Sequence, residues 1–162
     1  MTTLEIELPD ESATHSVGQK LAQLVEAAPK PMSMYFSGPL GAGKTSLVRA
    51  MLRGLGVRGS IKSPSYALVE PYNFLKFSAY HFDFYRFFDQ NEWADSGFRE
   101  YFEQEDAICL VEWPEKAGQL LPKPDIHLRL AYLGDSGRRI ELVAHSEAGQ
   151  CLLQQLEKKQ SL

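Results

Sequence analysis

The sequence predicts a three-layer α/β fold, in which helices cover both faces of a mainly parallel sheet that ends in an antiparallel hairpin. Short apolar segments alternate with helical patterns through the first two thirds of the chain, which is typical of parallel strands joined by crossover helices. In the last third, residues 126–133 and 139–144 have strand composition and are joined through Gly-Asp-Ser-Gly. Two such segments with a short turn-rich connection predict the C-terminal hairpin.

Length and composition predict one domain over residues 1–162, with 44% apolar and 23% charged residues. The net charge of −4 argues against a broad nucleic-acid-binding surface, which would be basic. The two cysteines lack metal-ligand spacing, and the start of the chain has no basic and apolar leader. No apolar stretch reaches the length that spans a bilayer. We therefore expect a cytoplasmic protein without a membrane partner.

The first half of the chain is expected to form a strand–helix–strand–helix unit. Residues 3–8 alternate polar and apolar side chains, which predicts a strand with one buried face. Asp10 and Ser12 are candidate caps of the helix that follows. Residues 32–36 predict a strand that leads into a glycine-rich loop, and apolar spacing predicts a helix over 44–55.

The second half is expected to add three strands and a closing helix around the hairpin. Ser-Pro-Ser-Tyr opens an extended segment, 67–70, and residues 77–83 have the pattern of a strand. Residues 107–112 are apolar up to a final carboxylate, which is typical of a central parallel strand. Residues 147–158 predict the closing helix.

Residues 38–45 read Gly-Pro-Leu-Gly-Ala-Gly-Lys-Thr and match the phosphate-binding pattern G-x-x-x-x-G-K-[ST] in full. The glycines let successive backbone N–H groups turn around phosphate oxygens. Lys44 supplies a charge for the β- and γ-phosphates, and the Thr45 hydroxyl can bind Mg²⁺. The loop therefore predicts a P-loop NTPase domain that binds ATP and Mg²⁺. Its candidate nucleotide-binding residues are Gly38, Pro39, Leu40, Gly41, Ala42, Gly43, Lys44, Thr45 and Ser46.

Two carboxylates stand at predicted strand ends, where ligands collect in open α/β sheets. Glu112 follows the most apolar strand, so it is the better candidate for the Walker B residue that supports the metal. Asp83 is the better candidate for orienting water. Either one alone could equally be a solvated carboxylate, but both become candidate site residues beside a P-loop.

Four sequence blocks occur in order: residues 38–45, Ser-Pro-Ser-Tyr at 63–66, His-Phe-Asp-Phe-Tyr-Arg at 81–86, and Val-Glu-Trp-Pro-Glu at 111–115. Together they resemble the bacterial TsaE family, the ATPase component of tRNA threonylcarbamoyladenosine synthesis. Many NTPases share the first block, whereas the last two are much more specific to this family.

The resemblance implies roles for individual residues. Lys44 and Thr45 bind phosphate and Mg²⁺, Glu112 is the Walker B carboxylate that helps to bind the metal, and Asp83 is a catalytic or metal-supporting acid. Residues 63–66 form a switch-like segment that senses the γ-phosphate, with Ser65 where the family usually has threonine. Trp113 lies beside the nucleotide.

The resemblance also implies function and partners. The chain would hydrolyse ATP slowly, acting with the proteins TsaB and TsaD, and would reach tRNA indirectly through their complex. Two alternatives stay open: a small-molecule kinase, which would need an arginine-rich lid, and an assembly subunit in which nucleotide binding alone carries the function. A signalling GTPase is disfavoured because N-K-x-D and D-x-x-G are absent from the sequence.

Several other residues have two interpretations. Arg86 could stabilise charge on a transferring phosphoryl group or pair with a carboxylate. His81 and His127 are interpreted as structural, since no second histidine or cysteine stands at metal-binding spacing. Nine aromatic residues between 72 and 88 exceed what one small core needs, so we expect part of them to form an apolar patch for a protein partner.

Overall fold

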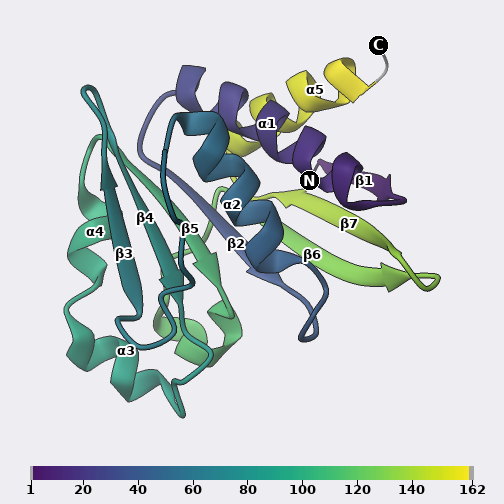
Figure 1. Ribbon diagram of the computed structural model, residues 1–162. Coiled ribbons are helices and arrows are strands. Elements are labelled where there is room, and N and C mark those ends of the chain that lie inside the picture. Colours follow the sequence, from purple (N-terminus) through teal and green to yellow (C-terminus); the bar gives the residue numbers. More distant parts are fainter. Residues whose placement is uncertain (1, 161–162) are drawn as a thin grey trace.

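A seven-stranded sheet runs through the centre of the molecule in the order β1-β7-β6-β2-β5-β4-β3 (Figure 1). The computed structural model describes residues 2–160. Four neighbouring strands in the middle of the sheet are parallel to one another: β6 Ile126–Leu133, β2 Met32–Ser37, β5 Ala107–Glu112 and β4 Ser78–Asp83. This arrangement brings the carboxyl ends of the central strands to one edge.

The antiparallel strands lie at the flanks of the sheet. Strand β7 Gly137–Ala144 pairs with β6 as the predicted hairpin, and β1 Thr3–Leu8 pairs antiparallel with β7. On the other side, β3 Val69–Asn73 runs antiparallel to β4. Only β7 and β3 oppose the common direction, so the expectation of a mainly parallel sheet with a C-terminal hairpin is confirmed.

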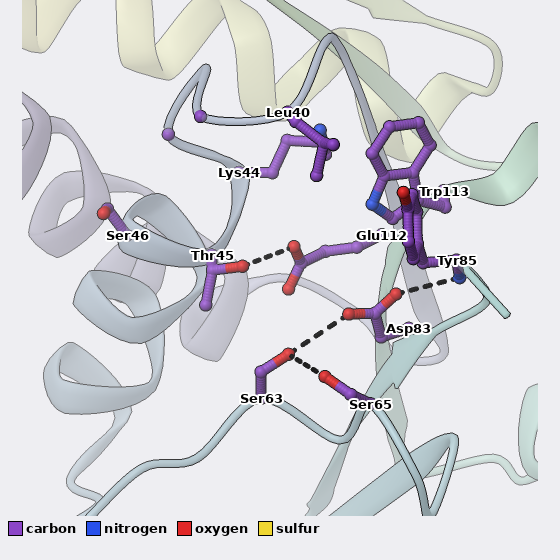
Figure 2. Close-up of a pocket in the computed structure, with 12 residues that line it drawn as sticks. Leu40, Lys44, Thr45, Ser46, Ser63, Ser65, Asp83, Tyr85, Glu112 and Trp113 are labelled. Carbon is purple, nitrogen blue, oxygen red and sulfur yellow. Dashed lines mark hydrogen bonds between the residues drawn. The ribbon is translucent and has the colours of Figure 1, made fainter.

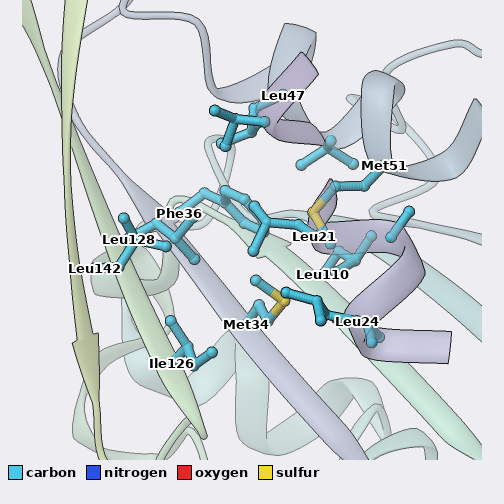
Figure 3. Packing of buried hydrophobic residues seen from close by; sticks show 14 of the residues in the cluster. Leu21, Leu24, Met34, Phe36, Leu47, Met51, Leu110, Ile126, Leu128 and Leu142 are labelled. Atoms are coloured by element: carbon cyan, nitrogen blue, oxygen red, sulfur yellow. The ribbon is translucent and has the colours of Figure 1, made fainter. Parts of the chain in front are cut away.

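Three helices cover one face of the sheet: α1 Glu11–Ala27, α2 Lys44–Leu55 and α5 Glu147–Gln160 (Figure 1). They pack on side chains that alternate along the strands, because successive residues of a strand point to opposite faces. On β2, Met34 and Phe36 point toward these helices (Figure 3). Phe36 of β2 therefore shares one hydrophobic cluster with Leu47 and Met51 of α2.

A second helical layer covers the opposite face with α3 Gln90–Ser96, α4 Arg99–Glu103 and the 3₁₀ helix η1 Pro114–Leu120. The sequence patterns predict none of these three short helices. They lie over a separate aromatic core. In this core Phe82 of β4 contacts Phe84, which follows the strand, and Phe98, which precedes α4. The two cores complete the three predicted layers.

Most of the aromatic residues from which an apolar docking patch was expected are at least partly buried. Of the nine aromatic residues between 72 and 88, only Tyr85 and Phe88 are exposed. Phe84 instead stacks on Phe87, with ring centroids 4.8 Å apart, and meets Trp93 edge to face. The surplus is divided between two cores, because Phe77 belongs to the main core, whereas Tyr80, Phe82, Phe84 and Phe87 belong to the second, which the sequence patterns did not indicate.

The local ends of the helices follow the expected chemistry, with one exception. Asp10 caps α1, since its Oδ1 accepts a hydrogen bond of 2.8 Å from the backbone of Ala13, whereas Ser12 lies inside the helix. Gly56, with φ of 110°, ends α2 in the left-handed conformation that glycine allows. In residues 2–160, no helix is long and apolar enough to cross a bilayer.

The segment after Ser-Pro-Ser-Tyr differs from its predicted extended form. Residues 65–67 form a turn, closed by a 2.8 Å hydrogen bond from Leu68 N to Pro64 O. Leu68 has φ of 70°, and the strand begins only at Val69. The turn is held in place because Asp83 N donates to Leu68 O at 3.0 Å, which ties it to the end of β4.

Candidate functional site

A pocket of about 350 Å³ opens where β2, β4 and β5 end beside the start of α2 (Figure 2). Its lining contains Leu40, Gly41, Gly43, Lys44, Thr45, Ser46, Ser63, Ser65, Asp83, Tyr85, Glu112 and Trp113. All of these except Tyr85 were predicted from the sequence, Ser63 as a member of the 63–66 segment. Segments far apart in the chain therefore converge on one hollow.

The glycine-rich loop takes backbone conformations that other residues rarely adopt. Gly38, Gly41 and Gly43 have φ of 148°, 79° and 101°. A Cβ atom at Gly38 would lie 2.4 Å from Leu130 O, so a side chain there would also clash with β6. The loop leads directly into α2, whose first backbone N–H groups have no partner within the helix. Such a helix start is a binding site for anions.

Three predicted loop residues do not line the pocket. Gly38 and Pro39 contribute their carbonyl oxygens, which face Lys44. Ala42 is fully buried and belongs to the main core. These residues shape the loop from behind, while Leu40, with 62% of its surface exposed, projects at the pocket mouth.

Lys44 is the cation inside the loop. Its Nζ donates hydrogen bonds of 2.5 Å to Gly38 O and 3.0 Å to Pro39 O, and it lies 4.0 Å from the centre of the Trp113 ring. Burial lowers the pKa of Lys44, and the carboxylates of Glu112, Glu115 and Asp83 oppose that shift. Its direct partners are neutral, so an anion entering the pocket would find a cation with no paired counter-charge.

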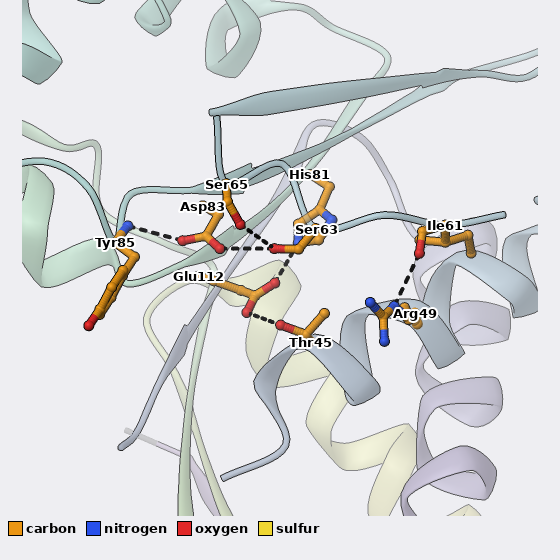
Figure 4. A network of polar contacts seen from close by, with 9 residues as sticks. All are labelled: Thr45, Arg49, Ile61, Ser63, Ser65, His81, Asp83, Tyr85 and Glu112. Carbon is orange, nitrogen blue, oxygen red and sulfur yellow. Dashed lines mark hydrogen bonds and ion pairs between the residues drawn. The ribbon is translucent and has the colours of Figure 1, made fainter. Parts of the chain in front are cut away.

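Glu112 joins the loop to the sheet. Thr45 Oγ1 donates to Glu112 Oε1 at 2.6 Å, and Glu112 Oε2 lies 2.6 Å from His81 Nε2 (Figure 4). Glu112 is only 1% exposed and His81 is fully buried. The Walker B candidate therefore touches the hydroxyl that the P-loop pattern assigns to the metal.

Asp83 lies opposite Glu112 in the register of β4 and β5 but has its own partners. Its Oδ2 accepts a 3.1 Å hydrogen bond from Ser63 Oγ, and its Oδ1 accepts one of 3.0 Å from Tyr85 N. Ser65 Oγ donates to Ser63 Oγ at 3.3 Å, so the 63–66 segment is linked to Asp83 through a chain of hydroxyls (Figure 4).

The oxygens at this edge suit Mg²⁺. A threonine hydroxyl and a carboxylate lie together beside a loop shaped for phosphate, and Mg²⁺ is usually bound by one or two carboxylates plus substrate phosphates and water. Within residues 2–160, no group of three or more His, Cys, Asp and Glu side chains could hold an ion by itself. The donor set therefore fits a metal that arrives with a nucleotide.

Aromatic side chains form the remaining wall of the pocket. Trp113 has φ of 57° and packs against Tyr85, with ring centroids 4.9 Å apart.

Arg86 stacks over Tyr66 at 4.1 Å and has no ion pair among the described residues. The interpretation of Arg86 as the partner of a carboxylate is therefore wrong for this structure.

Comparison with known proteins assigns the family. The profile of the family described as "Threonylcarbamoyl adenosine biosynthesis protein TsaE" matches residues 8–140. The chain belongs to the TsaE family. The TsaE proteins it resembles are named as components of tRNA threonylcarbamoyladenosine biosynthesis.

Individual TsaE relatives match nearly the whole chain. A TsaE protein of Haemophilus influenzae is 42% identical over 155 residues, which cover 94% of this chain and 97% of the relative. A TsaE protein of Bacillus subtilis is 32% identical over 143 residues, or 88% of this chain and 89% of that one. The crystal structure of Bacillus subtilis YdiB superposes with a TM-score of 0.81, at 25% identity, and covers 98% of this chain and 97% of that chain.

Two residues of this TsaE site, Tyr85 and His81, were not among the sequence candidates, and the contact of a third, Ser63, was not predicted. Ser63 belongs to the 63–66 segment whose switch role the resemblance implied, but its hydrogen bond to Asp83 was not predicted. Tyr85 follows Asp83 by two residues, and its backbone N–H is what contacts the carboxylate. His81 precedes Asp83 by two residues, which puts both side chains on the same face of β4. Pairing of His81 with Glu112 depends on strand register, which the sequence does not specify.

Proposed function

We propose that this chain is the ATP-binding and slowly hydrolysing component of the machinery that makes N6-threonylcarbamoyladenosine in tRNA, acting with TsaB and TsaD. The observation that carries the proposal is the contact of 2.6 Å between Thr45 Oγ1 and Glu112 Oε1 at the end of a P-loop. This contact joins the two protein groups that a magnesium nucleotide requires beside its phosphates. Family membership supports the pathway.

The phosphate groups would be bound by the loop backbone and Lys44. The loop glycines and the start of α2 offer N–H groups to the phosphate oxygens, and Lys44 Nζ lies within the same turn. Because its present acceptors are two carbonyl oxygens, Lys44 can exchange them for phosphate oxygens and gain a charged partner. Lys44 would thus neutralise charge during transfer.

The metal would be held by Thr45 and supported by Glu112. A Mg²⁺ ion held there would supply positive charge that neutralises the phosphates during transfer. Thr45 supplies a hydroxyl oxygen, and Glu112 supplies a carboxylate at the same position. Burial of Glu112 keeps water away from this charge, which strengthens its interaction with a cation.

Asp83 would orient the water that attacks the γ-phosphate in line with the leaving group. Two hydrogen bonds hold its carboxylate at the pocket wall, one from Ser63 and one from the backbone of Tyr85. Ser65 is coupled to Asp83 through Ser63. A γ-phosphate near this hydroxyl chain would change the contacts of the 63–66 segment, which supports a switch role for it.

We expect slow turnover by the isolated chain because its pocket supplies little positive charge to the transition state. None of the described residues that line the pocket is an arginine, so Lys44 and the loop N–H groups must stabilise the transition state without one. An arginine supplied in cis or by a partner is worth about 10³–10⁵ in turnover in related chemistry. A partner protein that completes the site would therefore accelerate hydrolysis.

The direct test is ATP turnover of the chain alone, with TsaB and TsaD, and with both proteins plus tRNA. We expect slow hydrolysis by the chain alone and faster hydrolysis in the mixture, and Glu112→Gln should suppress it while keeping ATP binding. Fast turnover that ignores the partners would contradict the proposal. Full activity of Glu112→Gln in tRNA modification would instead favour an assembly subunit gated by nucleotide binding.

A further inference from the structure

His81 makes one polar contact, and that contact is with the Walker B candidate. Its Nε2 lies 2.6 Å from Glu112 Oε2, and the ring is fully buried between β4 and α2 (Figure 4). A carboxylate oxygen accepts hydrogen bonds, so Nε2 carries the hydrogen in this pair. His81 Nδ1 has no hydrogen-bond partner among the described residues. The hydrogen bonding of the ring is therefore directed at Glu112.

The two oxygens of Glu112 have different partners. Oε1 accepts from Thr45 and Oε2 from His81, so the carboxylate is held from both sides. Asp83 cannot replace His81 in this role, because its carboxylate only accepts hydrogen bonds, here from Ser63 and Tyr85, and has no hydrogen to donate to Glu112. A glutamate has three rotatable bonds in its side chain, and without His81 only the Thr45 contact would define its orientation.

We propose that His81 is a positioning residue that orients Glu112, so that Oε1 faces Thr45 where the metal of the proposed function would bind. The inference rests on that proposed function. Groups that orient a metal ligand change metal affinity about 10–100-fold when they are removed. His81 would therefore set how strongly Mg²⁺ promotes nucleotide binding, while metal-free binding depends on the loop and Lys44.

The test compares two amides that differ in reach. In His81→Gln the side-chain amide nitrogen can occupy the position of Nε2, whereas in His81→Asn it is too short to contact Glu112. ATP affinity is measured by calorimetry in EDTA and in Mg²⁺, and thermal unfolding is followed in parallel. We expect His81→Asn to lose about 10-fold or more of the Mg²⁺ enhancement and His81→Gln to retain most of it. Affinity in EDTA should be unchanged in both.

Tyr80→Phe is the matched control, because Tyr80 is next to His81 on β4 but belongs to the second core, where its hydroxyl donates a 2.6 Å hydrogen bond to Gln104 and not to Glu112. It should keep the wild-type Mg²⁺ enhancement. If wild-type protein shows no Mg²⁺-dependent ATP binding, the proposed function fails. If wild-type protein shows it and His81→Asn keeps it, the role of His81 fails. Should His81→Asn not fold, His81→Leu replaces it, and unfolding of both would assign His81 to the fold and reject the positioning role.

Discussion

His127 shows at the scale of one residue how burial controls charge beside the loop. It lies on β6 opposite Tyr35 of β2, and its Nε2 is 2.7 Å from Ser37 Oγ, the residue before the glycine-rich loop. Burial, reinforced by the nearby cations Arg129 and His145, lowers the pKa of His127 from 6.5 to about 4. The folded protein therefore keeps this ring neutral in mildly acidic solution.

This pKa predicts a loss of stability in acid. Below pH 6.5 the unfolded chain binds a proton at His127 that the folded chain does not accept until about pH 4, so the free energy of unfolding falls across that window. We expect wild-type protein to lose about 1–3 kcal/mol more than His127→Gln between pH 6.5 and 4, measured by urea denaturation. His15→Gln, at an exposed position of α1, should follow the wild-type curve. Identical curves for wild type and His127→Gln would contradict the assignment.

Trp113 should report nucleotide through its fluorescence. It lies over Lys44 inside the pocket, whereas Trp93 is buried in the second core against Phe84 and Phe102. We expect a change in emission on adding ATP or ADP that persists in Trp93→Phe and vanishes in Trp113→Phe. A signal that follows Trp93 would place the nucleotide elsewhere.

At the scale of elements, the contact between α1 and α2 depends on two glycines. A Cβ atom at Gly18 would lie 2.3 Å from Ala50 Cβ, and one at Gly54 would lie 2.6 Å from Ala22 Cβ. Each glycine thus admits a methyl group of the opposite helix. This close approach holds α2, and with it the end of the phosphate-binding loop, against the rest of the helical layer.

Gly18→Ala should therefore destabilise the protein although alanine is the better helix former. The propensity gain of about 0.5–1 kcal/mol is smaller than the usual overpacking cost of about 1–3 kcal/mol, so we expect a net loss of about 1–2 kcal/mol in chemical denaturation. Ser16→Ala, on the exposed side of the same helix, should be neutral or slightly stabilising. A more stable Gly18→Ala would mean that the helices separate without cost.

Elements with strong periodicity could be predicted from the sequence, and short ones could not. The apolar pattern of 107–112 predicted a central strand, and β5 does lie inside the sheet, where its neighbours are β2 and β4. The helices α3, α4 and η1 have seven, five and seven residues, too few for a helical period to stand out. Their stability comes from the aromatic core, a tertiary contact that local pattern does not contain.

At the scale of the whole molecule, the sheet order explains why the site could be predicted in part. The residues of the loop could be predicted from its motif. Asp83 and Glu112 could be predicted from their positions at strand ends, because parallel strands bring their carboxyl ends to one edge of the sheet. The hydrogen-bond partners of those two carboxylates could not be predicted from the sequence. Whether Glu112 meets Thr45, His81 or both depends on the β4–β5 register and on the position of α2, which only the assembled fold defines.

The central claim is that this chain binds ATP with Mg²⁺ through the 38–45 loop. Calorimetric titration of Mg²⁺-ATP into wild-type protein, Lys44→Ala and Lys116→Ala tests it most directly, with circular dichroism to verify folding. Lys116 is the matched control, because it lies 5.6 Å from the Tyr85 ring at the edge of the pocket but outside the loop. We predict binding by wild type and Lys116→Ala, and no measurable binding by folded Lys44→Ala. Equal affinity of Lys44→Ala and wild type would contradict the account.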